Sequence, residues 1–215
     1  MTAPVRTTVH LLRHGEVHNP QGVLYGRLDG YHLSDLGRDM AGAVARHLAD
    51  HDVTHVVASS LERAQETARP VADSHGLAVT TDDRVIEASN RFEGERVGAM
   101  RPTDFVHPRH WSKLTNPLRP SWGEAYAVVA RRMLAAVADA REAARGHEAV
   151  VVSHQLPIWT VRNALMGKRL WHDPRKRECR LASLTTLTYL DDELESVTYS
   201  EPAGALLARS HGGTG

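Results

Sequence analysis

The stretch TVHLLRHG, residues 8–15, decides the fold class of this chain. Residues 8–12 are largely apolar and β-branched, a pattern typical of a short buried strand. The next three residues turn abruptly polar and basic. Residues 53–59 repeat this form and end at the serine pair Ser59-Ser60, and residues 149–153 repeat it and lead into His154. Such runs predict buried strands of a parallel sheet.

The segments between these runs predict helices. Ser34 is the expected N-cap of a helix along which Met40, Val44 and Leu48 recur at helical spacing. Residues 61–75 have the composition of a second helix. Strands that alternate with helices in this way predict an α/β fold with a mostly parallel sheet.

The remaining elements follow from local signals. Ser121 and Glu124 form an S-x-x-E capping box, which predicts a long helix after them. A short strand is expected over 77–81, and residues 181–190 and 195–200 are expected to form a terminal hairpin.

No linker divides the chain, so we expect a single domain over residues 1–215. The irregular stretch 88–120 is expected to be an inserted cap that is too short for a core of its own. Residues 205–215 are expected to be a disordered tail.

The bulk composition excludes several classes of protein. The chain has 215 residues, 41% of them apolar, and 26 basic residues balance 26 acidic ones. This zero net charge argues against nucleic acid and an anionic membrane as partners. No apolar run approaches the ~18 residues of a membrane span, and no signal peptide is recognised at the start. With Cys179 as the single cysteine, these features predict a cytoplasmic protein.

Basic side chains follow the predicted parallel strands. Arg13 and His14 end the first strand, Arg63 lies one helical turn after the second, and His154 follows the third. Ligands of open α/β sheets bind outside the carboxyl ends of the strands, so these side chains are expected to converge. The guanidinium group matches phosphate with a planar fork of donors, which predicts an anion pocket.

The histidines add chemistry that simple binding does not need. A neutral imidazole can accept a phosphoryl group, and a second, protonated imidazole can stabilise charge on the phosphoryl oxygens. The leaving alcohol needs a proton, for which Glu87 and Glu93 are the candidates nearest in sequence. The residues alone predict an anion-binding α/β domain and leave open whether it is catalytic.

Four segments in this order resemble the histidine phosphatase superfamily, also called the phosphoglycerate mutase-like family. They are LLRHGEVHNPQGVLYGRLDGYHLSDLG (11–37), SSLERAQETA (59–68), RVIEASNRFEG (84–94) and VVVSHQLPI (150–158). The resemblance extends over residues 9–189, nearly the whole chain. It implies a three-layer α/β/α sandwich and a reaction without a metal or other cofactor.

The resemblance also implies roles for individual residues. It makes His14 the phosphorylated nucleophile and Glu87 the proton donor. The implied phosphate clamp consists of Arg13, Arg63 and His154, and Asn19 and Arg27 are implied at the rim of the pocket.

The chain departs from the family pattern in three places. The spacing from the R-H-G motif to Asn19 is one residue shorter than in many relatives. Gln155 stands where glycine is common, which would place an amide beside the phosphate. The residues after Glu87 are ASNRFEG instead of the commoner aromatic-rich form, so the contacts to the leaving group stay open.

Other basic residues lie outside these motifs. The expected cap carries Arg91 and further basic residues, which predict either a lid over an anionic substrate or a solvated loop. The basic segment 168–180 lacks interleaved aromatic residues, which favours substrate or subunit contacts over nucleic acid and leaves a homodimer open. The sequence has 14 histidines, but we recognise no CxxC and no H-x-x-x-H helix pair, so no metal site is expected.

These observations favour a phosphatase, a phosphoric monoester hydrolase, that acts on a small phosphorylated metabolite. Two alternatives stay open. One is a phosphoglycerate mutase-type isomerase. The short chain disfavours it, because the family resemblance implies longer chains for such mutases. The other is a non-catalytic phosphate-binding protein, which the joint presence of His14, Arg13, Arg63, Glu87 and His154 disfavours.

Overall fold

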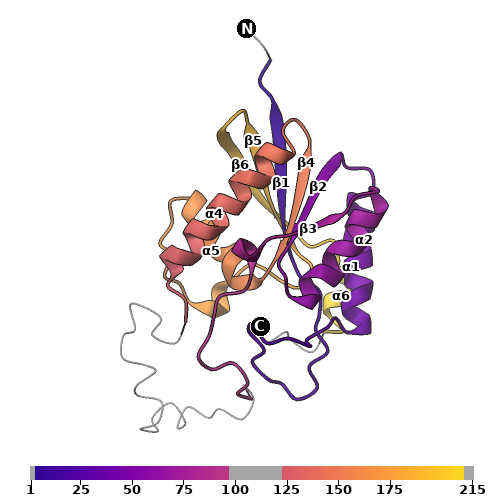
Figure 1. Cartoon of the computed structure of the whole chain (residues 1–215), viewed down its shortest axis with the longest axis vertical. Coiled ribbons are helices and arrows are strands. Elements are labelled where there is room, and N and C mark those ends of the chain that lie inside the picture. Colours follow the sequence, from indigo (N-terminus) through magenta and orange to yellow (C-terminus); the bar gives the residue numbers. More distant parts are fainter. Residues whose placement is uncertain (1–2, 97–122, 211–215) are drawn as a thin grey trace.

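A six-stranded sheet forms the centre of the molecule in the computed structural model, which describes residues 3–96 and 123–210 (Figure 1). Its strands are β1 (Arg6–Arg13), β2 (Val53–Ala58), β3 (Val79–Thr81), β4 (Glu148–Ser153), β5 (Leu184–Leu190) and β6 (Glu193–Ser200). Their order across the sheet is β3-β2-β4-β1-β5-β6. Strands β1 to β4 pair in parallel, whereas β5 and β6 form the expected antiparallel hairpin at one side. The prediction of a mostly parallel sheet is confirmed.

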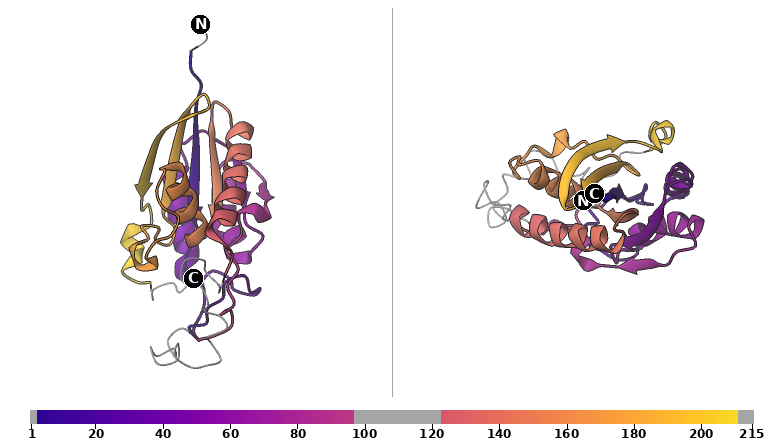
Figure 2. Two further views of the ribbon diagram at one scale, coloured as in Figure 1. Left: turned by 90° about the vertical axis from the view of Figure 1, so that its left-hand side faces the viewer. Right: turned by 90° about the horizontal axis from the view of Figure 1, so that it is seen from above.

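Helices cover both faces of this sheet, which gives the three layers visible in Figure 2. The main ones are α1 (Asp35–Leu48), α2 (Glu62–Ser74), α4 (Tyr126–Ala143) and α5 (Gln155–Leu165). On one face Leu12 and Val150 pack with the apolar sides of α1 and α2. On the other face Leu11 and Val151 pack with α4 and α5. Neighbouring residues of one strand thus serve opposite layers, because successive side chains of a strand alternate.

The beginning of α1 follows the predicted capping signal. The Ser34 hydroxyl accepts a hydrogen bond from the Gly37 amide at 2.9 Å, and it donates one to a Glu16 carboxylate oxygen at 2.6 Å. The three apolar residues expected on its inner face, Met40, Val44 and Leu48, are fully buried. The cap ties the loop after β1 to the helix that follows it.

The predicted start of the long helix after the cap was wrong. Helix α4 begins at Tyr126 with Ala125 as its N-cap, so the capping box at Ser121 and Glu124 does not start it. Glu124 instead forms ion pairs with two arginines, Arg27 and Arg132.

The expected disordered tail begins too early, since residues Gly204–Leu207 form the short helix α6. Most of the expected cap and Ser121 lie outside the described residues. Within the described part of the chain, no helix is long and apolar enough to cross a membrane.

Candidate active site

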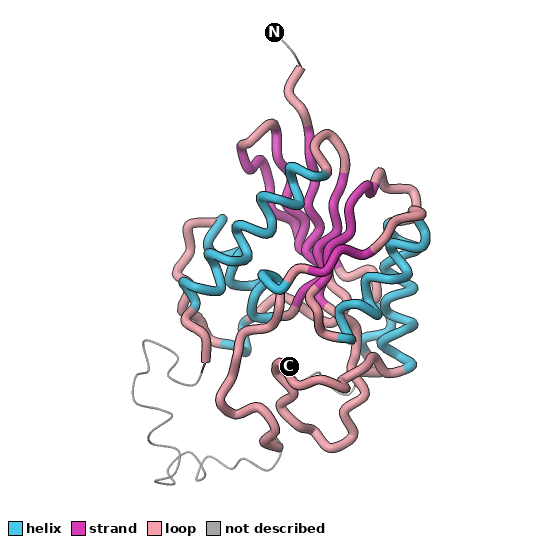
Figure 3. Tube along the Cα trace, in the orientation of Figure 1, coloured by secondary structure: helices cyan, strands magenta, loops and turns pink. Residues whose placement is uncertain are grey.

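The carboxyl ends of three adjacent strands meet at one edge of the sheet. Register pairs Arg13 of β1 with Ser153 of β4, and Ala58 of β2 with Val152 of β4. His14, Ser59 and His154 therefore leave the sheet side by side. Long loops gather at this edge, away from the N-terminus (Figure 3).

His14 is fixed as a neutral imidazole by its surroundings. The residue is 1% exposed, and its Nδ1 lies 2.8 Å from the carbonyl oxygen of Gly15. Because a carbonyl only accepts, Nδ1 carries the proton and Nε2 keeps its lone pair. Burial, and then the charges of Arg63 and Arg13, hold the pKa of His14 well below its ordinary value. The Nε2 atom is therefore ready to act as a nucleophile near neutral pH.

The Gly15 backbone holds this histidine in place. Its amide donates to the Thr67 hydroxyl of α2 at 3.1 Å, and that hydroxyl donates to the Arg63 carbonyl at 2.6 Å. A side chain at residue 15 would meet the Gly37 carbonyl oxygen at 2.6 Å, so the two backbones approach as only glycine permits. The R-H-G motif thus meets the first turn of α1 without a gap.

Two buried arginines present unpaired donors beside His14. Arg13 Nη1 donates to the carbonyl of Cys179 at 2.8 Å, and Arg63 Nη2 donates to the carbonyl of Gly26 at 2.5 Å. The Nε and Nη2 atoms of Arg13 and the Nε and Nη1 atoms of Arg63 are buried without a partner in the described structure. Buried charged donors without a partner are costly, and an anion would satisfy them together.

His154 completes the cluster from the N-cap of α5. Its ring centroid lies 5.1 Å from that of His14, and its Nε2 lies 2.9 Å from the Ser59 hydroxyl. Its Nδ1 is buried without a partner in the described structure. Burial and the neighbouring arginine Arg63 lower the pKa of His154 well below its ordinary value. We expect a phosphate dianion to reverse that effect and favour the charged imidazole.

Glu87 supplies a buried carboxyl group to the same surroundings. Its Oε1 accepts from the Ala88 amide at 2.8 Å. Burial raises the pKa of Glu87, although the charges of Arg63, Arg177 and Arg13 act in the opposite direction. A carboxyl group with a raised pKa can hold a proton for a leaving group. The rival Glu93 instead accepts the backbone amide of Asn90 at 3.0 Å and is only half-buried.

The cluster combines a buried neutral imidazole, unpaired guanidinium donors that could bind an anion and a buried carboxyl group. The sequence model of the histidine phosphatase superfamily (branch 1) matches residues 9–202. The chain belongs to the histidine phosphatase superfamily.

Several known proteins resemble the chain along most of its length. Rv0525, an uncharacterised protein of Mycobacterium tuberculosis (strain H37Rv), is 58% identical over 202 residues, which cover 93% of this chain and 98% of that protein. A probable phosphoglycerate mutase, GpmB of Yersinia pestis (strain Pestoides F), is 30% identical over 84% of both chains. The structure of the mycobacterial glucosyl-3-phosphoglycerate phosphatase Rv2419c is 28% identical, covers 91% of this chain and 96% of its own, and superposes with a TM-score of 0.70.

The structure gives supporting contacts to Asn19 and Arg27, the two residues predicted at the rim of the pocket. Asn19 closes its own loop, because its amide group both donates to and accepts from the backbone of Val23. Arg27 Nε donates to the Glu87 carbonyl at 2.6 Å, which holds the acid-bearing segment. Arg91 is exposed. Direct contacts of these three residues with a substrate stay predictions.

Gln155 lies between two arginine contacts. Its Nε2 donates to the Cys179 carbonyl, which Arg13 also contacts, at 3.3 Å. Its Oε1 accepts from Arg177 Nη1 at 3.4 Å. The amide nitrogen of Gln155 thus donates to Cys179 while its oxygen accepts from Arg177. A glycine at this position could make neither side-chain contact. Its predicted contact with phosphate stays a prediction.

Sequence reasoning missed two residues of the site. The Tyr25 ring is buried, and the Arg63 guanidinium lies over it at 4.7 Å from the ring centroid. Arg177 lines a pocket beside Glu87, and its charge acts to lower the pKa of the Glu87 carboxyl group. Arg177 stood in the sequence only as one of many basic residues in the segment 168–180, and no local signal separates it from the exposed ones.

Proposed function

We propose that this protein is a phosphatase that hydrolyses a small phosphate monoester through a phosphohistidine on His14. One observation carries the proposal: four guanidinium nitrogens of Arg13 and Arg63 are buried without a partner in the described structure, next to a neutral, buried His14. A binding protein needs such donors, but it does not need a desolvated nucleophile beside them.

The reaction follows in two balanced steps. His14 Nε2 attacks phosphorus, the bond to the alcohol oxygen breaks, and the Glu87 carboxyl gives its proton to that oxygen. Water then attacks the phosphohistidine, the Glu87 carboxylate takes a proton from it, and inorganic phosphate leaves His14 unmodified. Arg13, Arg63 and a protonated His154 stabilise the charge on the phosphoryl oxygens in both steps.

The pocket beside Glu87 supports a small substrate. It has a volume of about 220 Å³, and its lining includes Leu24, Tyr126, Leu156 and Arg177. This volume lies below the ~300–1,000 Å³ of sites for drug-sized ligands. We propose that the alcohol part of a phosphorylated metabolite lies there, with Arg177 offering a cation to a polar or anionic group.

A phosphoglycerate mutase is the second candidate, because the probable mutase GpmB is 30% identical. The chain length does not argue against it after all, since the match covers 84% of both chains. The match to a phosphatase structure over 91% of this chain supports hydrolysis. Both reactions use the same phosphohistidine and differ in whether water or a second hydroxyl accepts the phosphoryl group.

The deciding experiment follows one phosphoryl group through turnover. Brief exposure to labelled substrate should leave acid-labile, base-stable phosphate on the wild type and none on His14→Ala. His18→Ala is the matched control, because His18 is an exposed histidine of the same loop. Turnover by His14→Ala at the wild-type rate would overturn the mechanism.

The same material separates the two candidate reactions. With 3-phosphoglycerate as substrate, a coupled assay measures 2-phosphoglycerate while a second assay measures free phosphate. Faster formation of the isomer than of free phosphate would identify a mutase and overturn the assignment as a hydrolase. A screen of phosphorylated metabolites for phosphate release then identifies the substrate.

A further inference from the structure

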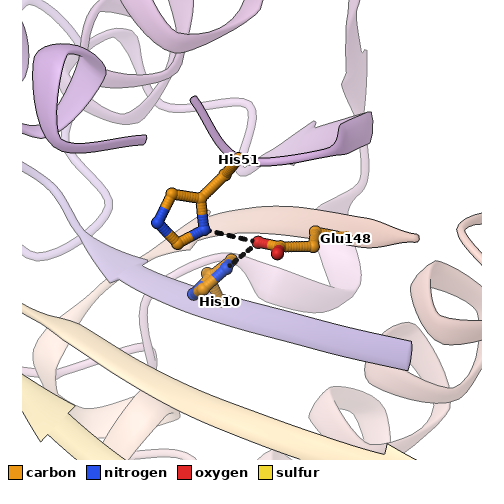
Figure 4. Close-up of side chains that lie close together, drawn as sticks. All are labelled: His10, His51 and Glu148. Carbon is orange, nitrogen blue, oxygen red and sulfur yellow. Dashed lines mark hydrogen bonds and ion pairs between the residues drawn. The ribbon is translucent and has the colours of Figure 1, made fainter. Parts of the chain in front are cut away.

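Three potential metal ligands meet inside the fold, on side chains from three separate elements. His10 comes from β1, Glu148 begins β4, and His51 lies in the turn after α1 (Figure 4). One carboxylate oxygen, Oε2 of Glu148, lies 2.7 Å from His10 Nε2 and 2.8 Å from His51 Nδ1. The ligand atoms of all three residues lie within 4.8 Å of one another.

This cluster is separate from the anion site. His10 precedes His14 by four residues on an extended strand, a separation of about 13 Å along the backbone. Glu148 is the first residue of β4, at the opposite end of that strand from His154. The mechanism proposed above uses none of these groups.

The cluster is buried at its centre and open at one side. The side chain of His10 is 5% exposed, that of Glu148 is 23% exposed and that of His51 is 36% exposed. A small ion could therefore enter past His51, whereas His10 and the sheet close the far side. On this exposed side, water would be the fourth ligand.

A second layer of contacts orients the ligands. His10 Nδ1 lies 2.9 Å from the Thr186 hydroxyl on the neighbouring strand β5, which directs Nε2 toward Glu148. The carbonyl oxygen of His51 lies 3.2 Å from His75 Nε2, which holds the turn that carries His51. For His10, the Thr186 partner on the other ring nitrogen is the usual device that fixes the orientation of a metal-binding histidine.

We propose that His10, His51 and Glu148 bind one divalent transition-metal ion of the zinc class. Two imidazole nitrogens and one carboxylate oxygen are a ligand set that zinc uses, with water in the fourth position. The ion would replace the N–H protons that now lie between the imidazoles and the carboxylate. Bonds of about 2.0 Å to zinc require ligand atoms to stand roughly 3.3 Å apart, an outward shift of about 0.6 Å from the present contacts.

His47 and His51 are four residues apart, but they are not an H-x-x-x-H helix pair, because α1 ends at Leu48, before His51. Of the two, only His51 belongs to the cluster. Their ring centroids lie 5.8 Å apart, and His47 is exposed next to the opening. The other two ligands, His10 and Glu148, are 138 residues apart in sequence, and only the pairing of β1 with β4 brings them together.

The test is a zinc titration of the full chain after treatment with EDTA and gel filtration. Competition against a chromophoric chelator should give one equivalent of Zn²⁺ for the wild type. The variants His51→Gln and Glu148→Gln should bind at least about tenfold more weakly, and Thr186→Val should weaken binding roughly 10- to 100-fold through the second layer. His55→Gln is the matched control, because it removes a half-buried histidine of β2 outside the cluster.

Two further measurements test whether the bound zinc lies at this cluster. His14→Ala should retain the full equivalent of zinc, which excludes His14 as a ligand. If Glu148→Gln fails to fold, the half-exposed position of His51 still allows His51→Gln to report.

Removal of the ion with EDTA should lower the melting temperature of the wild type, since a ligand that binds only the native state stabilises it. Phosphate release should stay unchanged, because the cluster is remote from His14. A wild type that binds no zinc, or a His51→Gln variant that binds it as tightly as the wild type, would overturn the proposal.

Discussion

Arg63 illustrates at the scale of one residue how this chain prepares a site for an anion. The side chain is fully buried, its Nη2 is used by the Gly26 carbonyl, and its plane lies over the Tyr25 ring. Burial lowers the pKa of the guanidinium from its ordinary value, but that value is so high that the charge persists. The remaining donors are therefore fixed before any ligand arrives, which avoids reorganisation during the reaction.

The variant Arg63→Ala should accordingly lose turnover much more than stability. Loss of one preorganised donor to a developing charge costs about 3–4 kcal/mol, or roughly 100- to 1,000-fold in kcat. Steady-state kinetics measures the loss, and circular dichroism checks that the melting temperature is retained. Arg69→Ala, on the exposed side of the same helix, should behave as wild type. Comparable activity of the Arg63 and Arg69 variants would contradict the proposed clamp.

Glu87 makes a prediction that depends on the leaving group. An alkoxide leaves poorly without a proton, whereas the phenolate of p-nitrophenyl phosphate leaves without help. Glu87→Gln should therefore damage hydrolysis of an alkyl phosphate far more than that of p-nitrophenyl phosphate. Equal damage to both would show that Glu87 positions the phosphate or the water. No damage to either would transfer the role to Glu93 or another carboxylate.

The same two groups set the expected pH dependence. His14 must be neutral, and its lowered pKa means that activity rises with pH through a value well below 6.5. Glu87 must be protonated, and its raised pKa means that activity falls as pH rises through a value above 4.5. The profile of kcat/KM against pH should thus be a bell in which Glu87 sets one limb. Glu87→Gln should remove that limb, and an unchanged limb would assign it to another group.

Among the helices and strands, the sequence predicted correctly those features that depend on residues close together in the chain. The strand β1, the Ser34 cap and the inner face of α1 followed from apolar runs, a capping residue and helical spacing. The S-x-x-E box failed because Glu124 pairs with Arg132 of α4 and with Arg27, which is 97 residues away in sequence, so no local pattern reveals the second partner. Arg177 and the His10–Glu148 contact escaped for the same reason, since the folded chain alone brings their partners close.

The junction between β1 and α1 tests how tightly the elements fix His14. An added Cβ on Gly37 would lie 2.0 Å from the Glu16 carbonyl oxygen, a backbone atom that cannot rotate away. Gly37→Ala should therefore push the loop that carries His14, destabilise the fold by about 1–3 kcal/mol and reduce kcat.

The matched control for that variant is Gly42→Ala, in the interior of the same helix. Its Cβ would meet only the end of the Arg46 side chain, at 3.4 Å. We expect the free energy of unfolding to rise by roughly 0.5–1 kcal/mol, because alanine loses less conformational freedom than glycine on folding. Turnover should not change. Chemical denaturation and steady-state kinetics of both variants would measure this, and equal behaviour of the two would refute the close-packed junction.

Across the whole molecule, two polar clusters lie near opposite ends of the same strands, one suited to an anion and the other to a cation. The edge that carries His14 gathers unpaired donors from Arg13 at the end of β1, from His154 after β4 and from Arg63 of α2. The His10 cluster gathers ligands for a cation around a carboxylate nearer the other end of the same strands. The zero net charge of the chain conceals this division, which explains why composition argued against nucleic acid but could not reveal either site.

An anion at this edge should stabilise the entire fold. It would join β1, α2 and the residue after β4 through donors on Arg13, Arg63 and His154 that otherwise lack partners in the described structure. Inorganic phosphate or vanadate at a hundredfold excess over its Kd adds about 2.7 kcal/mol to the native state. For a chain of this size that raises Tm by roughly 5–10 °C. Thermal denaturation in phosphate, compared with chloride at equal ionic strength, measures the shift. Arg63→Ala should lose most of it, and a shift of the same size in that variant would mean that phosphate binds elsewhere.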